Sequence, residues 1–128
     1  MKPKAKLLLV DDDVDLVRVM KGTLESKDYE VIVAYDGKEG MEKAKKEKPD
    51  LVVLDILMPV ADGFVFADQF RKEPSLTKIP VIALTSFSES LGQPFPFEVT
   101  EYIQKPLKPR DLVAKVEECL KKRPALAR

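Results

Sequence analysis

Histidine is absent from this chain of 128 residues, and cysteine occurs only once, as Cys119. Without an imidazole, the chain cannot form histidine-based zinc sites or Ser–His and Cys–His nucleophile systems, and it cannot carry a phosphohistidine of its own. A single cysteine excludes an internal disulfide and is typical of a protein in the reducing cytoplasm. Cys119 falls on the apolar side of the expected last helix, which favours a place in the core over a catalytic role.

The sequence also lacks a long apolar run and an excess of either charge. No apolar run approaches the length that crosses a bilayer, and three aspartates at 11–13 follow the basic N-terminus too soon for a secretory signal. Lys and Arg together number 22, as do Asp and Glu, so no general attraction to nucleic acids or anionic membranes is expected. We therefore expect a cytoplasmic protein without membrane insertion or direct nucleic-acid binding. The length suits a single domain over residues 1–128, with a core at about 5–121 and a flexible tail at 122–128.

Short apolar runs alternate along the chain with segments whose apolar residues recur at helical spacing. The expected strands cover residues 6–10, 30–35, 51–54, 79–84 and 101–104, and the expected helices cover 14–27, 38–48, 64–72 and 109–121. Such alternation predicts an α/β domain with a parallel sheet, helices on both faces and right-handed crossovers. The flavodoxin-like (βα)5 doubly wound sheet, with strand order 2-1-3-4-5, is the common solution at this length.

The segment where a fourth helix would lie, at about residues 87–97, is unusual. It contains Gly92, Pro94 and Pro96, which cannot all occupy one regular helix. We therefore expect this helix to be shortened or irregular. Three of the six phenylalanines of the chain also lie here, and packing of a rebuilt loop explains them better than a docking site does.

Acidic residues stand at the ends of two expected strands. Asp11 and Asp12 follow the first strand, and Asp55 follows four consecutive aliphatic residues in the third. In the expected strand order these two strands are neighbours, so their carboxyl ends meet where ligands bind in open α/β sheets. Like charges so close raise each other's pKa and cost stability unless a cation joins them. A hard divalent cation with oxygen ligands, Mg²⁺ above all, is the expected partner.

Two further polar residues follow the fourth and fifth expected strands. Thr85 follows the fourth strand and Lys105 follows the fifth, so a hydroxyl and an ammonium join the carboxylates at one edge. Alone, each residue has an ordinary structural explanation: Thr85 as a helix cap, Lys105 as a solvated strand end, and Asp55 as a cap or loop residue. Together, acids, a hydroxyl and a lysine at the ends of four strands form a set suited to phosphoryl transfer.

These residues occur within motifs that resemble the receiver domain of two-component response regulators. The resemblance covers about residues 5–121 and rests on Val10-Asp11-Asp12, Leu54-Asp55-Ile56-Leu57-Met58-Pro59 with Gly63, Leu84-Thr85-Ser86, and Tyr102-Ile103-Gln104-Lys105-Pro106. The chain departs from the family pattern at residues 87–100, next to surfaces through which the family commonly signals.

The resemblance implies a role for each residue of the metal set. Asp55 would be the phosphoacceptor. Asp11 and Asp12 would hold Mg²⁺ together with Asp55 and the backbone carbonyl of Leu57.

The resemblance also implies the groups that meet the phosphoryl group. Thr85 would bond a phosphoryl oxygen, Lys105 would pair with the phosphoryl charge, and Tyr102 would be the switch aromatic that turns inward when Thr85 moves.

The function that follows is that of a signalling phosphoacceptor. A sensor histidine kinase or a phosphotransfer protein would present phosphohistidine to Asp55, and phosphorylation would switch a surface that binds a downstream protein. Such a domain catalyses its own phosphorylation and dephosphorylation without being a metabolic enzyme. One alternative is a pseudo-receiver, a phosphorylation-independent protein-interaction module, which the departure at residues 87–100 favours. A phosphohydrolase of another α/β family is a weaker alternative, because such enzymes commonly need a second acid where this chain has Leu57.

Overall fold

The structure is a computed structural model that describes residues 4–55, 62–85, 100–106 and 108–122. Along these residues the chain forms β1 (Lys6–Val10), α1 (Val14–Glu25), β2 (Glu30–Ala34), α2 (Gly37–Glu47), β3 (Leu51–Asp55), α3 (Asp62–Lys72), β4 (Val81–Thr85), β5 (Glu101–Gln104) and α4 (Pro109–Lys122).

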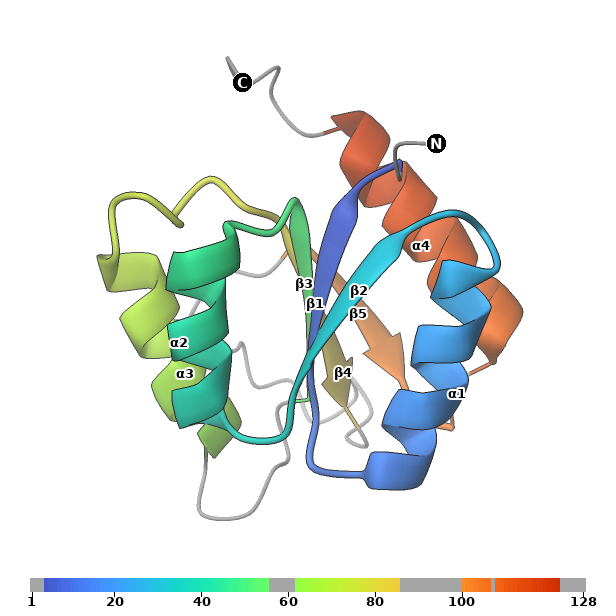
Figure 1. Ribbon diagram of the computed structural model, residues 1–128, viewed down its shortest axis with the longest axis horizontal. Helices are drawn as coiled ribbons and strands as arrows, with labels where there is room; N and C mark the ends of the chain where they lie inside the picture. Colours follow the sequence, from blue (N-terminus) through green and yellow to red (C-terminus); the bar gives the residue numbers. More distant parts are fainter. Residues whose placement is uncertain (1–3, 56–61, 86–99, 107, 123–128) are drawn as a thin grey trace.

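The strands form one parallel sheet in the order β2-β1-β3-β4-β5. Helices α1 and α4 cover one face of the sheet, and α2 and α3 cover the other (Figure 1). The predicted flavodoxin-like doubly wound sheet is therefore confirmed. The prediction of a shortened or irregular helix at 87–97 falls on residues outside the described part of the chain, as do Leu57 and the tail from 123 onward.

Alternation along each strand divides the core into two layers, because successive side chains point to opposite faces of the sheet. On β1, Leu7 and Leu9 belong to the layer beneath α1 and α4. Leu8 and Val10 belong to the layer beneath α2 and α3. All four are fully buried, so β1 is covered on both faces, as a central strand of a parallel sheet must be.

Two helices begin at aspartate caps, whose side-chain oxygens satisfy backbone amides that the first helical turn leaves unpaired. Asp13 accepts a hydrogen bond from the amide of Leu16 at the start of α1, as its position before the helix predicts. Asp36 accepts one from the amide of Glu39 at the start of α2. Both helices begin at the edge of the sheet where the strands end (Figure 1).

The register brings the carboxyl ends of the strands to a common level. Val10 of β1 pairs with Leu54 of β3, and Asp55 pairs with Leu84 of β4. Thr85 in turn pairs with Gln104 of β5. Asp55 is thus the last residue of β3, one position beyond the predicted end, because its backbone still belongs to the ladder with β4.

Where other element boundaries differ from the sequence prediction, they differ by one or two residues. Strand β4 begins at Val81, two residues later than predicted, because the amide of Ile79 donates to Leu76 in a turn and Pro80 has no amide hydrogen. Helix α1 ends at Glu25, and the chain then turns through Asp28 with a φ of 72°.

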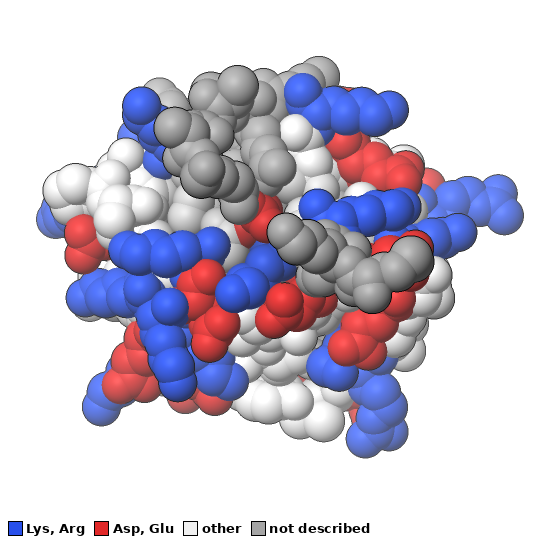
Figure 2. All heavy atoms as spheres, turned by 45° about the horizontal axis from the view of Figure 1, so that its top comes forward, with Lys and Arg blue, Asp and Glu red and all other residues white. Residues whose placement is uncertain are grey.

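The surface of the described residues carries charges of both signs (Figure 2). Basic and acidic side chains are interspersed on the face shown in Figure 2, as the equal numbers of the two charges lead one to expect. Within the described ranges, no helix has the length and apolar character needed to cross a membrane.

Candidate functional site

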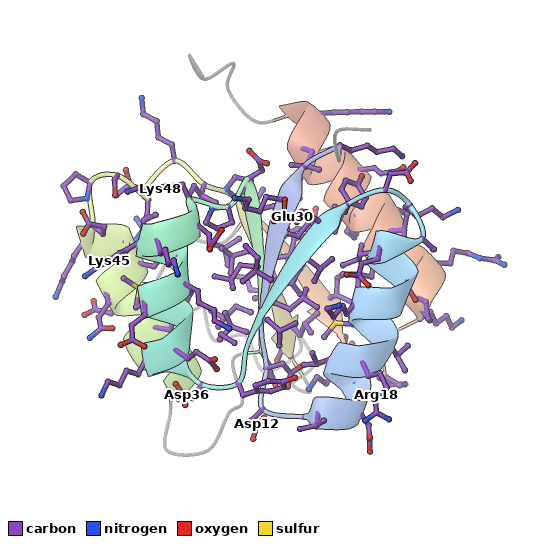
Figure 3. All side chains as sticks on the ribbon, viewed as in Figure 1. Asp12, Arg18, Glu30, Asp36, Lys45 and Lys48 are labelled. Atoms are coloured by element: carbon purple, nitrogen blue, oxygen red, sulfur yellow. The ribbon has the colours of Figure 1, made fainter. Side chains whose placement is uncertain are left out.

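Three carboxylates converge at the carboxyl ends of β1 and β3. Asp11, Asp12 and Asp55 each offer an oxygen, and these oxygens all lie within 4.8 Å of one another. Asp11 and Asp55 are buried, with 0% and 3% of their surface exposed, whereas Asp12 is exposed. Figure 3 shows Asp12 in the turn that leads from β1 to α1. The strand order predicted this convergence, and the structure contains it.

The backbone holds Asp11 on two sides. Its amide donates to the carbonyl of Ala34 at 3.1 Å, which continues the pairing of β1 with β2. Its Oδ1 accepts a hydrogen bond from the amide of Asp13 at 2.9 Å. Its Oδ2 is buried and has no hydrogen-bond partner among the described residues. One carboxylate oxygen is therefore bound to a backbone amide, and the other lies 4.0 Å from Nζ of Lys105.

Burial makes the charge on Asp11 costly. Desolvation, helped by the nearby charge of Asp55, raises the pKa of Asp11 from 3.8 to about 7, while the Asp13 amide and the Lys105 ammonium oppose the rise. A buried carboxyl group with a raised pKa is one that a cation would stabilise, since a cation favours the ionised form.

Lys105 supplies a positive charge from the other side of the cluster. Its Nζ lies 3.1 Å from Asp55 Oδ2 and 4.0 Å from Asp11 Oδ2. Lys105 directly follows β5, and its amide donates to the carbonyl of Thr85 at 2.7 Å. The peptide bond between Lys105 and Pro106 is cis. A cation of the chain itself therefore pairs with both buried carboxylates.

Thr85, Tyr102 and Leu57 are the other residues that the sequence assigned to the site. Thr85 ends β4 and is buried at the same edge of the sheet. Tyr102 lies within β5, pairs with Ala83 in register, and is partly exposed. The predicted carbonyl ligand of Leu57 lies outside the described residues, so the structure brings together four of the predicted residues (Asp11, Asp12, Asp55 and Lys105), with Thr85 at the same edge.

The residues that are present fit a small divalent cation. Two buried carboxylates and one exposed carboxylate form an all-oxygen donor set, which suits Mg²⁺ better than softer metals. The buried Oδ2 of Asp11 without a hydrogen-bond partner among the described residues has the character of a ligand atom.

The sequence analysis did not predict the hydrogen bond from the amide of Asp13 to Oδ1 of Asp11. The signal was available, because an aspartate side chain often accepts a hydrogen bond from the backbone amide two residues later. What the pattern could not reveal is that this amide turns the carboxylate of Asp11 toward the cluster.

A family model described as the response regulator receiver domain matches residues 7–117. The chain belongs to this family. The resemblance seen in the motifs is thereby confirmed over most of the chain.

Curated relatives of this receiver domain are longer proteins. It is 36% identical over 119 residues to the alkaline phosphatase synthesis transcriptional regulatory protein PhoP of Bacillus subtilis (strain 168), a match that covers 91% of this chain and 49% of the relative. It is also 36% identical over 121 residues to the probable transcriptional regulator ycf27 of Porphyridium aerugineum, covering 93% of this chain and 49% of that protein. The chain thus spans about half the length of the curated relatives it matches.

Solved structures agree in fold over nearly the whole receiver domain. A putative response regulator from Chloroflexus aurantiacus superposes with a TM-score of 0.85 at 30% identity, covering 94% of this chain and all (100%) of that one. The chemotaxis response regulator CheY4 of Vibrio cholerae superposes with a TM-score of 0.82 at 32% identity, covering 89% of this chain and 97% of CheY4.

Proposed function

We propose that this receiver domain accepts a phosphoryl group on Asp55 from the phosphohistidine of a sensor histidine kinase or a phosphotransfer protein, in a reaction that depends on Mg²⁺. The observation that supports this most directly is the buried carboxylate of Asp55, 3.1 Å from the ammonium of Lys105 and beside two further carboxylates. Because these 128 residues contain no histidine, the phosphohistidine must come from outside them. A single buried cysteine suits the cytoplasm, where such donors act.

The residues that would hold Mg²⁺ are Asp11, Asp12, Asp55 and the backbone carbonyl of Leu57. When bound there, Mg²⁺ would supply positive charge beside the phosphoryl oxygens. Asp11 and Asp12 do not react in this proposal. Their part is to offer oxygens at the edge of the sheet, where the pairing of β1 with β3 keeps them next to the acceptor.

Asp55 is the nucleophile in the proposed transfer. One of its carboxylate oxygens forms a bond to phosphorus while the phosphorus–nitrogen bond of the donor breaks. The electron pair of that bond passes to the imidazole nitrogen, which takes up a proton from solvent. Lys105 is positioned to pair with charge on the phosphoryl oxygens, and the Thr85 hydroxyl is the proposed donor to one of them.

We further propose that the aspartyl phosphate, which hydrolyses in time, switches a surface recognised by a downstream protein. Movement of Thr85 toward the phosphoryl group would be followed by Tyr102, two residues before the position in β5 that pairs with Thr85. The relatives named as transcriptional regulators are about twice as long, and their names describe those proteins. Direct contact with nucleic acid is not part of the function proposed for this chain.

The test is the intact mass of the protein after incubation with Mg²⁺ and acetyl phosphate. The wild type should gain the mass of one phosphoryl group. The gain should disappear in Asp55→Asn and when a chelator removes divalent cations. A control receiver phosphorylated in parallel shows that the donor is active.

The competing function is that of a pseudo-receiver, a protein-interaction module that ignores phosphate. Gly92, Pro94 and Pro96 in the segment at 87–100, which departs from the family pattern, are the observation that favours it. An unchanged mass of the wild type alongside a phosphorylated control would establish this alternative.

A further inference from the structure

The turn between β1 and α1 contains three consecutive aspartates whose environments differ. Asp11 is buried, whereas Asp12 and Asp13 are exposed. The proposed metal site accounts for the first two. Asp13 is not a member of the carboxylate cluster, so its role in this turn has to be inferred from its own contacts.

Asp13 is fixed at the start of α1 by two hydrogen bonds. Its Oδ1 accepts from the amide of Leu16 at 3.1 Å, and its carbonyl accepts from the amide of Val17 at 2.9 Å. The residue is in an extended conformation, with φ −83° and ψ 100°, as helix N-caps commonly are. Together these bonds tie the backbone of Asp13 to the first turn of the helix.

The same residue donates in the opposite direction, toward the sheet. Its amide donates to Asp11 Oδ1 at 2.9 Å. The other oxygen of Asp11, Oδ2, lies 4.0 Å from Nζ of Lys105, the ammonium that also pairs with Asp55 at 3.1 Å. The rotation of the Asp11 carboxylate is therefore set by an amide that the helix cap holds in place.

We propose that Asp13 is a positioning residue for the cation site. Its side chain caps α1, the cap fixes its amide, and the amide leaves Oδ2 as the single Asp11 oxygen that faces the cation. The inference rests on the proposed function in that it takes Asp11 as a Mg²⁺ ligand. It goes further by assigning a role to a residue outside the ligand set, through geometry and not through charge.

The chain offers a matched control for loss of a cap. Asp36 caps α2 with the same two bonds, accepting from the amide of Glu39 at 2.8 Å and, through its carbonyl, from the amide of Gly40 at 2.9 Å. These bonds run to α2 and not to Asp11. Asp36→Ala therefore reports what the loss of an aspartate cap does to the protein as a whole.

The experiment measures the dissociation constant of Mg²⁺ by calorimetry in the wild type, Asp13→Ala, Asp13→Asn and Asp36→Ala. Partners that orient metal ligands typically contribute 10- to 100-fold in affinity, so Asp13→Ala should weaken Mg²⁺ binding by about ten-fold. Asp13→Asn keeps the capping oxygen and loses the charge, and it should stay within about three-fold of the wild type. Asp36→Ala should bind Mg²⁺ as the wild type does while losing a similar amount of thermal stability as Asp13→Ala.

A second readout needs no metal. Hydrogen exchange of the residue 13 amide in the metal-free protein should be faster in Asp13→Ala than in Asp36→Ala, because only the first variant frees that amide. Equal Mg²⁺ affinity in Asp13→Ala and Asp36→Ala would overturn the inference. So would equal weakening in Asp13→Asn and Asp13→Ala, since charge would then be the cause.

The two readouts also separate this inference from the proposed function. A wild type that binds no Mg²⁺ contradicts the proposed function. In that case, unchanged amide exchange in Asp13→Ala would show that the cap does not hold the amide, and would overturn the positioning role as well.

Discussion

At the scale of single residues, Asp11 is the carboxylate whose ionised form is least well stabilised in the site. Lys105 pairs with Asp55 at 3.1 Å but stands 4.0 Å from Asp11, whose Oδ2 has no hydrogen-bond partner among the described residues. A buried carboxylate that is only partly compensated disfavours its own ionised form. This incomplete compensation accounts for the raised pKa of Asp11. It also makes the stability of the metal-free domain depend on pH.

The pKa of Asp11 predicts how stability changes with pH. Because the pKa rises from 3.8 to about 7 on folding, the native state holds more protons than the unfolded state between these values. The contribution of Asp11 to the free energy of unfolding therefore falls as the pH rises from about 4 to about 7, and levels off above that. Asp11→Asn removes this contribution, so metal-free Asp11→Asn should be more stable than the wild type at pH 7.5, with the difference shrinking toward pH 4.

Urea denaturation of both proteins at several pH values measures this difference, and subtracting one curve from the other removes the titration of carboxyl groups that do not interact with Asp11. Identical pH dependence in the wild type and Asp11→Asn would show that Asp11 titrates normally.

At the scale of elements, α2 lies close to its neighbours because of a glycine. A Cβ built on Gly40 would lie 2.9 Å from Cε1 of Phe66 and 3.1 Å from Cγ2 of Val10. Phe66 is fully buried and stacks on Phe70 with 5.3 Å between ring centroids, so its ring has little room to withdraw. The close approach of α2 to α3 and β1 thus depends on the absence of a side chain at one position.

We predict that Gly40→Ala destabilises the domain. Overpacking a core costs roughly 1–3 kcal/mol, and the better helix propensity of alanine returns at most about 1 kcal/mol. Gly22, in α1, is the matched control because nothing lies within 4 Å of a Cβ built there. Gly22→Ala should therefore stabilise by about 0.5–1 kcal/mol. Denaturant midpoints of the two variants measure both effects, and a change of the same sign in both would contradict the packing argument.

At the scale of the whole molecule, two apolar layers stabilise a sheet whose carboxyl edge is crowded with negative charge. The layers beneath α1 and α4 and beneath α2 and α3 bury every strand of the sheet in part. The cluster of Asp11, Asp12 and Asp55 opposes this stability, because three carboxylates lie within 4.8 Å. A bound cation would convert this opposing contribution into a stabilising one.

We predict that Mg²⁺ raises the melting temperature of the wild type and not that of Asp12→Asn. A ligand at 100 times its dissociation constant stabilises the native state by about 2.7 kcal/mol. Without metal, Asp12→Asn should melt at a higher temperature than the wild type, because one charge leaves the cluster. Thermal unfolding with and without Mg²⁺ tests both statements. A metal-free Asp12→Asn that melts below the wild type would mean that Asp12 is mainly structural.

The sequence by itself determined the order of the elements and the residues at the strand ends. Apolar runs and helical spacing are local signals, so they identified the elements to within a few residues. These signals predicted the start of β4 too early, because Pro80 has no amide hydrogen and a turn precedes it. They predicted the end of β3 one residue too early, because Asp55 still pairs with β4. Strand order followed from alternation and length, because right-handed crossovers leave few arrangements.

Only the tertiary structure decided which atoms meet. Lys105 and Asp55 are 50 positions apart in the sequence. The distance between the Lys105 ammonium and the Asp55 carboxylate depends on how β3, β4 and β5 are paired in register. The same holds for Asp11, whose two oxygens differ because an amide at the start of α1 reaches one of them. The distance between Gly40 and Phe66 is likewise set by how α2 and α3 pack. Sequence patterns describe the backbone locally, whereas these contacts depend on the placement of segments that are distant along the chain.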